Sequence, residues 1–261
     1  MKTYSQRVFA VLPPSARGHV VASIGELIGT TSFLFLGFAG VHVAEITSKP
    51  IAATATGKED STVVGLTSSA LLYIALAMGF SLMVNAWIFF RISGGLFNPI
   101  VSMGMVLIGA LSLARGVLLI AMQTAGAIIA AYIVDAIFPG TLNVGCHLHP
   151  EVTVAQGVLI EMLLTALLVF TIFMLAAERH ESTAIAPIGI GVALFIVHLV
   201  GVFWTGAAVN PPRALAPAIV TRTFVAYHWI YYVGPIAGGL LAVILYKLIK
   251  ALEYETVQQE V

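Results

Sequence analysis

The chain has 261 residues, of which 59% are hydrophobic and only 9% are charged, and its formal net charge is zero. Charged residues make up about a quarter of an ordinary soluble domain, so this composition excludes a soluble fold and predicts a membrane protein. The balanced charge provides no basic surface for a nucleic acid. The single cysteine, Cys146, cannot form a disulfide within the chain, so we expect helix packing in the lipid to hold the fold together.

Six apolar segments are long enough to cross the hydrocarbon core of a bilayer, which needs ~20 helical residues. In chain order they are 20–43, 66–90, 115–137, 153–177, 184–204 and 227–250. Lysine and arginine gather at the ends on the side of the N-terminus, so the positive-inside rule predicts that both termini are cytoplasmic. The segments 1–19 and 251–261 are then cytoplasmic tails, and segment 1–19 lacks the features of a signal peptide.

Two further apolar segments, 96–109 and 207–221, are too short to span the bilayer, and each contains an Asn-Pro pair. Asparagine is a preferred N-cap and proline a preferred first helical residue, so Asn98-Pro99 and Asn210-Pro211 each predict a helix start. A helix of ~10 residues rises ~15 Å, about half the thickness of the core. We therefore expect two re-entrant half-helices that meet near the bilayer midplane.

The chain contains an internal repeat. The matching positions at equal spacing on the first and fourth spans are Glu26, Thr30 and Phe35, and Glu161, Thr165 and Phe170. Segment 93–99 also parallels segment 205–211. The repeats are 20–137 and 153–250, and because each contains three spans they have opposite orientations in the membrane. We expect an all-α membrane protein in which six transmembrane helices and two half-helices form an inverted repeat, in one domain over 1–261.

Each asparagine of the two pairs can cap its half-helix with the side-chain oxygen and point its amide N–H into a lumen. A water that accepts from both asparagines cannot accept from the next water, which interrupts proton transfer along the file. Because Pro212 lacks an N–H, we expect the cap of Asn210 to use the N–H of Arg213. The positive ends of the two half-helices repel a cation by roughly 3 kcal/mol at ~5 Å and an effective dielectric of ~20, and Arg213 adds to this barrier.

The chain resembles the aquaporins. The resemblance rests on the [Ser/Thr]-Gly-x-x-x-Asn-Pro motif in both halves, on Arg213 and on segment 228–235, and segment 84–91 is most similar to fungal water channels. It covers nearly the whole chain. It implies an hourglass fold, a homotetramer with one pore per subunit, and a passive water channel that blocks ions and protons. We expect such a protein in the plasma membrane.

The resemblance also assigns pore residues. It implies a midplane signature at Asn98, Pro99, Ile100, Asn210, Pro211 and Pro212, and a selectivity filter at Met78, His198, Ala207 and Arg213. Glycerol facilitators place a small residue where this chain has His198 and an aspartate where it has Ala214, so both residues favour water. Met78 replaces the usual aromatic residue, and Ile100 and Pro212 replace alanines. A broader pore for glycerol or hydrogen peroxide is therefore the alternative.

The sequence contains further candidate functional residues outside the midplane signature and the selectivity filter. The resemblance implies that Glu26 and Glu161 accept hydrogen bonds from the re-entrant loops, although buried carboxylates are also typical of proton-coupled transporters. Tyr4 is a candidate gate at the cytoplasmic mouth. A non-conducting scaffold protein would result if Ile100 and Pro212 closed the midplane. The segment 146–149 contains cysteine and histidine but no fourth ligand at a usual spacing, so we expect a structural loop and no metal. The sequence contains no motif of a catalytic triad, a phosphate-binding loop or a cofactor site, so we expect no cofactor and no enzyme activity.

Overall fold

The computed structural model describes residues 13–48, 67–178 and 181–257, and the described residues form helices and connecting loops without strands. The long helices are α2 (Pro14–Thr47), α3 (Ser68–Phe89), α5 (Leu113–Ile137), α6 (Val154–Ile172), α7 (Ala186–Thr205) and α9 (Ile230–Ala251). The short ones are α4 (Pro99–Leu107), α8 (Pro211–Thr221) and α10 (Tyr254–Val257), and a π-helical turn, Phe173–Ala177, extends α6. Within the described residues, six helices are long and apolar enough to cross a membrane, which confirms the predicted fold class.

The first helix begins earlier than the sequence indicated. We expected the first span to start at residue 20, but α2 starts at Pro14, directly after Pro13. Proline suits the first helical position because its missing N–H would have no partner there. The extra turns carry Arg17 and His19, which hydropathy alone assigns to a polar tail. The helix therefore extends beyond the apolar segment.

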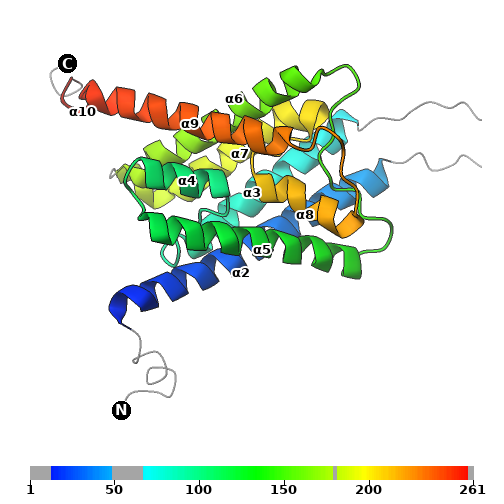
Figure 1. Cartoon of the computed structure of the whole chain (residues 1–261). Coiled ribbons are helices and arrows are strands. Elements are labelled where there is room, and N and C mark those ends of the chain that lie inside the picture. The colour runs from blue at the N-terminus through cyan, green and yellow to red at the C-terminus, as the bar shows by residue number, and fades with distance from the viewer. Residues whose placement is uncertain (1–12, 49–66, 179–180, 258–261) are drawn as a thin grey trace, which may run out of the picture.

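The two repeats pack in the same way. Helix α2 lies against α3 and α5 in the first repeat, α6 lies against α7 and α9 in the second, and α3 packs on α7 to join them. Figure 1 shows that the start of α2 and helix α10 lie at the same end of the bundle. We call this the terminal end, and the other the opposite end. Glycines allow the central crossing, because a Cβ on Gly79 or on Gly191 would lie 2.8 Å from the carbonyl oxygen of the other.

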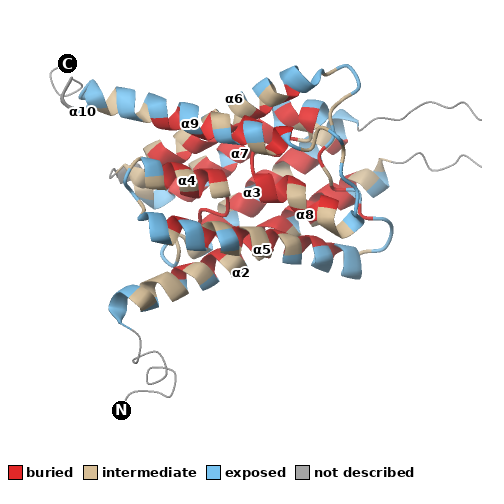
Figure 2. Ribbon diagram, in the orientation of Figure 1, coloured by how far each residue is buried: buried red, intermediate tan, exposed pale blue. Residues whose placement is uncertain are grey.

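Burial follows the pattern of a membrane channel. Figure 2 shows the buried residues at the centre of the bundle, around α3, α4 and α8, whereas exposed positions lie on the outer helices. The exposed positions include large apolar side chains such as Leu163 and Ile244, which suit contact with lipid tails. The buried polar and charged residues include Glu26, Gln123, Glu161, His198 and Arg213. Such residues in a membrane protein usually mark a functional site.

Candidate functional site

Two half-helices begin at the centre of the bundle. Asn98 and Asn210 are the N-cap residues of α4 and α8, with extended backbone angles of φ −146° and φ −149°. In Figure 1 α4 runs from the centre toward the terminal end and α8 toward the opposite end. Both helices therefore point the positive ends of their dipoles at the centre.

The residue before each asparagine has a backbone conformation that is uncommon for a side chain of its size. Phe97 has φ 50° and Val209 has φ 43°, both in the left-handed region. A buried carboxylate holds each of them. Glu26 Oε2 accepts a hydrogen bond of 2.8 Å from the Phe97 N–H, and Glu161 Oε2 accepts one of 2.8 Å from the Val209 N–H. The surrounding structure thus fixes a conformation that the local sequence disfavours.

The two carboxylates make equivalent bonds elsewhere in their loops. Glu26 Oε1 accepts from the Ser93 hydroxyl at 2.6 Å and the Leu96 N–H at 3.1 Å. Glu161 Oε1 accepts from the Thr205 hydroxyl at 2.7 Å and from the Ala208 N–H at 2.9 Å. Every oxygen of the two carboxylates therefore accepts a hydrogen bond from the re-entrant loop of its own repeat. These bonds hold each loop in place.

In the first repeat a further side chain joins the network. Gln123 on α5 donates from Nε2 to Glu26 Oε2 at 2.7 Å and to the hydroxyl of Ser102 on α4 at 2.8 Å. The amide therefore connects α5 with both α2 and the half-helix α4. Sequence reasoning did not identify Gln123, although a fully buried amide in a membrane span is itself a signal of a hydrogen-bond network.

The asparagines contact the opposite repeat. Asn98 Nδ2 donates to the carbonyl oxygen of Val209 at 2.9 Å, and Asn210 Nδ2 donates to that of Phe97 at 2.9 Å. One N–H of each amide is therefore used in the protein, and the other remains for the lumen. Both residues line the same central cavity.

The caps of the two half-helices differ, and one prediction is wrong. Asn98 Oδ1 accepts from the Ile100 N–H at 2.9 Å, whereas Asn210 Oδ1 has no partner within the described part of the chain. We expected the Arg213 N–H to cap Asn210. That N–H instead donates to the main-chain oxygen of Asn210, three residues earlier, at 2.9 Å in a 3₁₀-type bond, so it is not free for the side chain.

The central cavity has a volume of about 20 Å³. One water needs roughly 10–15 Å³, so the cavity holds about one or two water molecules. The lining residues come from both repeats and are Phe33, Met78, Leu82, Leu96, Phe97, Asn98, Val101, Leu168, Ile172, Leu194, His198, Ala208, Val209, Asn210 and Arg213. Much of this wall is apolar, so few groups can hold a polar molecule in place.

Three of the four predicted filter side chains, Met78, His198 and Arg213, line this cavity, and the fourth, Ala207, is buried but does not. Met78 is buried against Gly37, where a Cβ would lie 2.5 Å from the Met78 sulfur. A Cβ on Gly201 would lie 3.0 Å from the Cβ of Ala207, so Ala207 faces α7.

Arg213 and His198 each have a buried nitrogen without a protein partner among the described residues, Nε of Arg213 and Nε2 of His198. Arg213 is fixed by a hydrogen bond of 2.9 Å from a terminal nitrogen to the carbonyl oxygen of Val144, and its guanidinium lies 5.9 Å from the ring centre of Phe38. His198 Nδ1 lies 3.0 Å from the carbonyl oxygen of Leu194. Because a carbonyl only accepts, Nδ1 carries hydrogen, and Nε2 of the neutral ring is then an acceptor. The cavity wall therefore offers both a donor and an acceptor.

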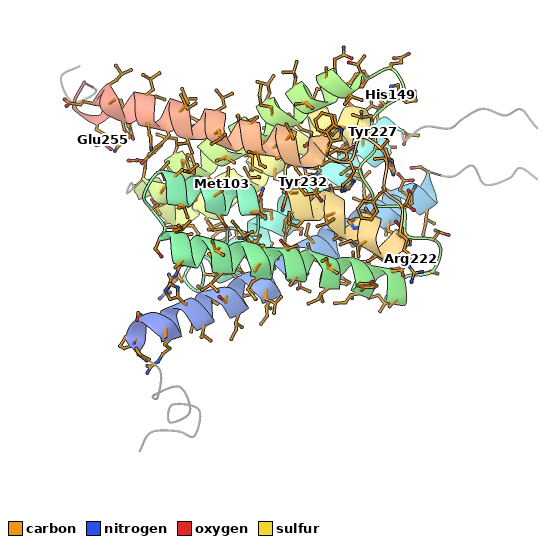
Figure 3. The ribbon with its side chains drawn as sticks, viewed as in Figure 1. Met103, His149, Arg222, Tyr227, Tyr232 and Glu255 are labelled. Carbon is orange, nitrogen blue, oxygen red and sulfur yellow. The ribbon has the colours of Figure 1, made fainter. Side chains whose placement is uncertain are left out.

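A wider cavity of about 200 Å³ opens at the opposite end, and we call it the vestibule. Arg213 borders both the vestibule and the central cavity, so it stands where the passage narrows. His147 and His149 also line the vestibule, and Figure 3 shows His149 at this end of the molecule. His147 is exposed to the vestibule, and partial desolvation there, followed by the charge of Arg213, lowers its pKa.

The segment 146–149 does not form a metal centre in the described part of the chain, where no three histidine, cysteine or acidic side chains are grouped for a metal ion. Burial raises the pKa of the Cys146 thiol to about 12. Since the thiolate is the form that binds metals, Cys146 is a poor ligand near neutral pH.

The remaining predicted pore residues lie outside the cavity wall. Pro99, Pro211 and Pro212 form the first turns of the half-helices, and Ile100 packs toward Gly239, where a Cβ would lie 2.5 Å from an Ile100 methyl group. Tyr4, the candidate gate, lies outside the described residues.

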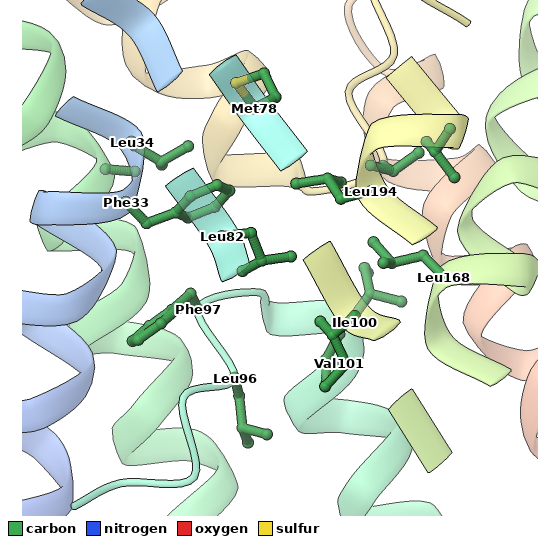
Figure 4. Packing of buried hydrophobic residues seen from close by; sticks show 14 of the residues in the cluster. Phe33, Leu34, Met78, Leu82, Leu96, Phe97, Ile100, Val101, Leu168 and Leu194 are labelled. Atoms are coloured by element: carbon green, nitrogen blue, oxygen red, sulfur yellow. The ribbon is translucent and has the colours of Figure 1, made fainter. Parts of the chain in front are cut away.

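Sequence reasoning missed most of the apolar wall. Leu82, Leu168 and Leu194, labelled in Figure 4, all line the central cavity. Leu82 lies one helical turn after Met78, and Leu194 lies one turn before His198, so helical periodicity from the filter residues could have found both. The repeat gives a second signal, because Phe33 and Leu168 follow Glu26 and Glu161 at the same spacing.

Comparisons with known proteins agree with this arrangement. The family model for the major intrinsic proteins matches residues 16–246. Aquaporin-7 of the fungus Botryotinia fuckeliana (strain B05.10) is 55% identical over 242 residues, which are 92% of this chain and 52% of that protein. An aquaporin-5 of the same fungus is 50% identical over 258 residues, 99% of this chain and 67% of that protein. The chain thus spans about half the length of some of the fungal proteins that it matches.

The structure is also similar to a solved one. The X-ray structure of the aquaglyceroporin from Plasmodium falciparum matches with a TM-score of 0.72 and 18% sequence identity, covering 92% of this chain and 99% of that chain. At this identity the match shows that the two chains share a fold.

Proposed function

The chain belongs to the major intrinsic protein family of membrane channels, and from this premise we propose that it is a passive water channel that excludes ions, protons and glycerol. The observation that carries the proposal is the central cavity of about 20 Å³, with Asn98 and Asn210 on its wall. Such a volume suits water in single file and is small for a solute with a carbon backbone.

The polar groups of the cavity support a selectivity for water. His198 Nε2 offers an acceptor and Arg213 Nε a donor, and the asparagine amides each keep one N–H for the lumen. These groups replace the hydrogen bonds that a water loses on entering the channel, while the apolar wall holds water weakly enough to let it leave. The other side chains of the described cavity wall are apolar, so they offer no hydrogen-bond partner to the several hydroxyls of glycerol.

Cations meet an electrostatic barrier in the same passage. Arg213 carries a full positive charge, which at ~5 Å and an effective dielectric of ~20 repels a monovalent cation by about 3 kcal/mol. The ends of α4 and α8 add positive partial charge at the asparagines. The loss of hydration in a passage of this width supplies the rest of the barrier.

A broader pore for glycerol or hydrogen peroxide is the second candidate, and one feature favours it. Met78 forms part of the wall and has a flexible, unbranched side chain that can change conformation. The solved structure that resembles this chain is named an aquaglyceroporin. If Met78 moved aside, the passage would widen next to His198.

The test compares water and glycerol fluxes into proteoliposomes by stopped-flow light scattering. The proposal expects a water permeability well above that of empty liposomes and little glycerol flux. Arg213→Ala and His198→Gly should each raise glycerol permeability relative to water, because each widens the wall. A wild-type glycerol flux that exceeds the water flux would establish the second candidate, and an absence of water flux would refute both.

The proposal also includes assembly and location. We propose a homotetramer in the plasma membrane with both termini in the cytoplasm and with residues 138–152 on the outside. The shared side of the two termini is supported by the positions of the start of α2 and helix α10, which lie at one end of the bundle (Figure 1), where Arg115 Nε lies 3.4 Å from His19 Nδ1. Crosslinking in native membranes would give the subunit number, and protection of terminal tags from added protease would give the orientation.

A further inference from the structure

The two half-helices differ in one hydrogen bond at the midplane. The Asn98 side chain is fixed by two bonds, one accepted from the Ile100 N–H and one donated to Val209. The Asn210 side chain is fixed by only one, which it donates to Phe97. Its oxygen Oδ1 is buried and has no partner among the residues that the structure describes.

Pro212 causes the difference. An N-cap side chain accepts from an N–H in the first helical turn, and in α4 the residue two positions after the asparagine supplies it. In α8 that position is Pro212, which has no N–H. The next N–H, of Arg213, already donates to the main-chain oxygen of Asn210. The chain itself therefore leaves the acceptor of Asn210 unused.

A buried carbonyl without a donor is unfavourable, so the Asn210 side chain gains from any molecule that can donate to Oδ1. Asn210 lines the central cavity, and the molecules that pass through it carry O–H groups. With one bond instead of two, the side chain is also freer to turn its oxygen toward the cavity. Asn98, with both of its bonds made, has no such tendency.

We propose that Pro212 is a specificity-determining residue that makes Asn210 an acceptor, as well as a donor, for the permeating molecule. The inference rests on the proposed function and deepens it, since it names hydrogen peroxide as a favoured second permeant. Water and hydrogen peroxide each carry two O–H groups, so either molecule can donate to Asn210 and accept from Asn98. The O–H group of hydrogen peroxide is more acidic than that of water and is the stronger hydrogen-bond donor, so an unused acceptor at Asn210 favours peroxide over water.

The two repeats supply a reciprocal experiment. Pro212→Ala restores an N–H to the second half-helix and should engage Asn210 Oδ1. Ile100→Pro removes the equivalent N–H from the first half-helix, and the Pro-Pro pair at the start of α8 shows that the backbone accommodates this sequence. Ile100→Ala loses the same side chain but keeps the N–H, so it is the reference for Ile100→Pro.

The measurement is the ratio of hydrogen peroxide to water permeability in proteoliposomes. A peroxide-sensitive dye enclosed in the liposomes reports the peroxide flux, and stopped-flow shrinkage reports the water flux. We expect Pro212→Ala to lower the ratio by less than the ~10-fold that a whole net hydrogen bond is worth, because water also donates to Asn210. Ile100→Pro should raise it relative to Ile100→Ala. A purely structural effect on the pore would not move the two variants in opposite directions.

The outcomes separate this inference from the proposed function. If Pro212→Ala has normal water flux and an unchanged peroxide-to-water ratio, the role of Pro212 is overturned and the proposed function stands. If Pro212→Ala does not fold, the same result in Ile100→Pro leads to the same conclusion. A wild-type chain that conducts neither water nor peroxide overturns the proposed function and this inference with it. Opposite shifts in the two variants support both.

Discussion

Asn98 and Asn210 each donate a hydrogen bond of 2.9 Å to the carbonyl oxygen of the residue that precedes the other. The starts of the two half-helices are thereby joined directly across the repeats. The carboxylates of Glu26 and Glu161 hold the same two loops from behind, through the N–H groups of Phe97 and Val209. The midplane is thus a connected set of hydrogen bonds, which leads to predictions about its parts.

Glu161→Gln should lower both stability and water permeability. The carboxylate accepts three hydrogen bonds, and an amide in its place directs N–H groups at one of these donors. A buried donor without an acceptor costs about 1–3 kcal/mol. The check is the thermal unfolding midpoint of the protein in detergent, together with stopped-flow water permeability. Glu151→Gln, on the exposed loop, is the matched control, and an equal midpoint for both variants would show that Glu161 does not support the re-entrant loop.

Gly238→Ala should weaken the crossing of α9 with α6. A Cβ at Gly238 would clash with the carbonyl oxygen of Met162 and would lie 2.8 Å from the Cβ of Thr165. Overpacking of a tight contact costs about 1–3 kcal/mol. Gly126→Ala should behave alike at the equivalent crossing of α5 with α2, since its Cβ would lie 2.7 Å from the Leu27 oxygen. Unchanged unfolding midpoints in both variants would contradict the packing.

Acidification should loosen the vestibule through His147. Partial desolvation and the Arg213 charge lower the pKa of His147 in the folded protein below the unfolded value of ~6.5, so the folded state binds fewer protons. The stability that His147 contributes is then complete above pH ~6.5 and is lost as the pH falls through the lowered pKa. The unfolding midpoint should fall on acidification, and less so in His147→Gln.

His228 belongs in the same experiment, because burial and the nearby His147 lower its pKa as well. The double variant His147→Gln/His228→Gln should therefore show a smaller fall in the midpoint than either single variant. If the double variant lost as much stability in acid as the wild type, the two imidazoles would not be responsible.

Hydropathy, the Asn-Pro pairs and the repeat were sufficient to predict six spans and two half-helices, because these features act locally along the chain. The start of α2 was missed since its first turns carry polar residues beyond the apolar segment. The free acceptor of Asn210 was missed because only the three-dimensional structure shows that the Arg213 N–H is already bonded to a main-chain oxygen. The apolar wall was missed because residues such as Leu82 look like any other leucine in a span.

The most direct test of the account is to fill the central cavity and measure water permeability. Leu82 lines the cavity from α3, whereas Leu72 lies on an exposed face of the same helix. In proteoliposomes with equal amounts of folded protein, Leu82→Trp should reduce water permeability to that of empty liposomes, while Leu72→Trp should conduct like the wild type. A folded Leu82→Trp variant with the wild-type water permeability would show that water does not pass between Asn98 and Asn210.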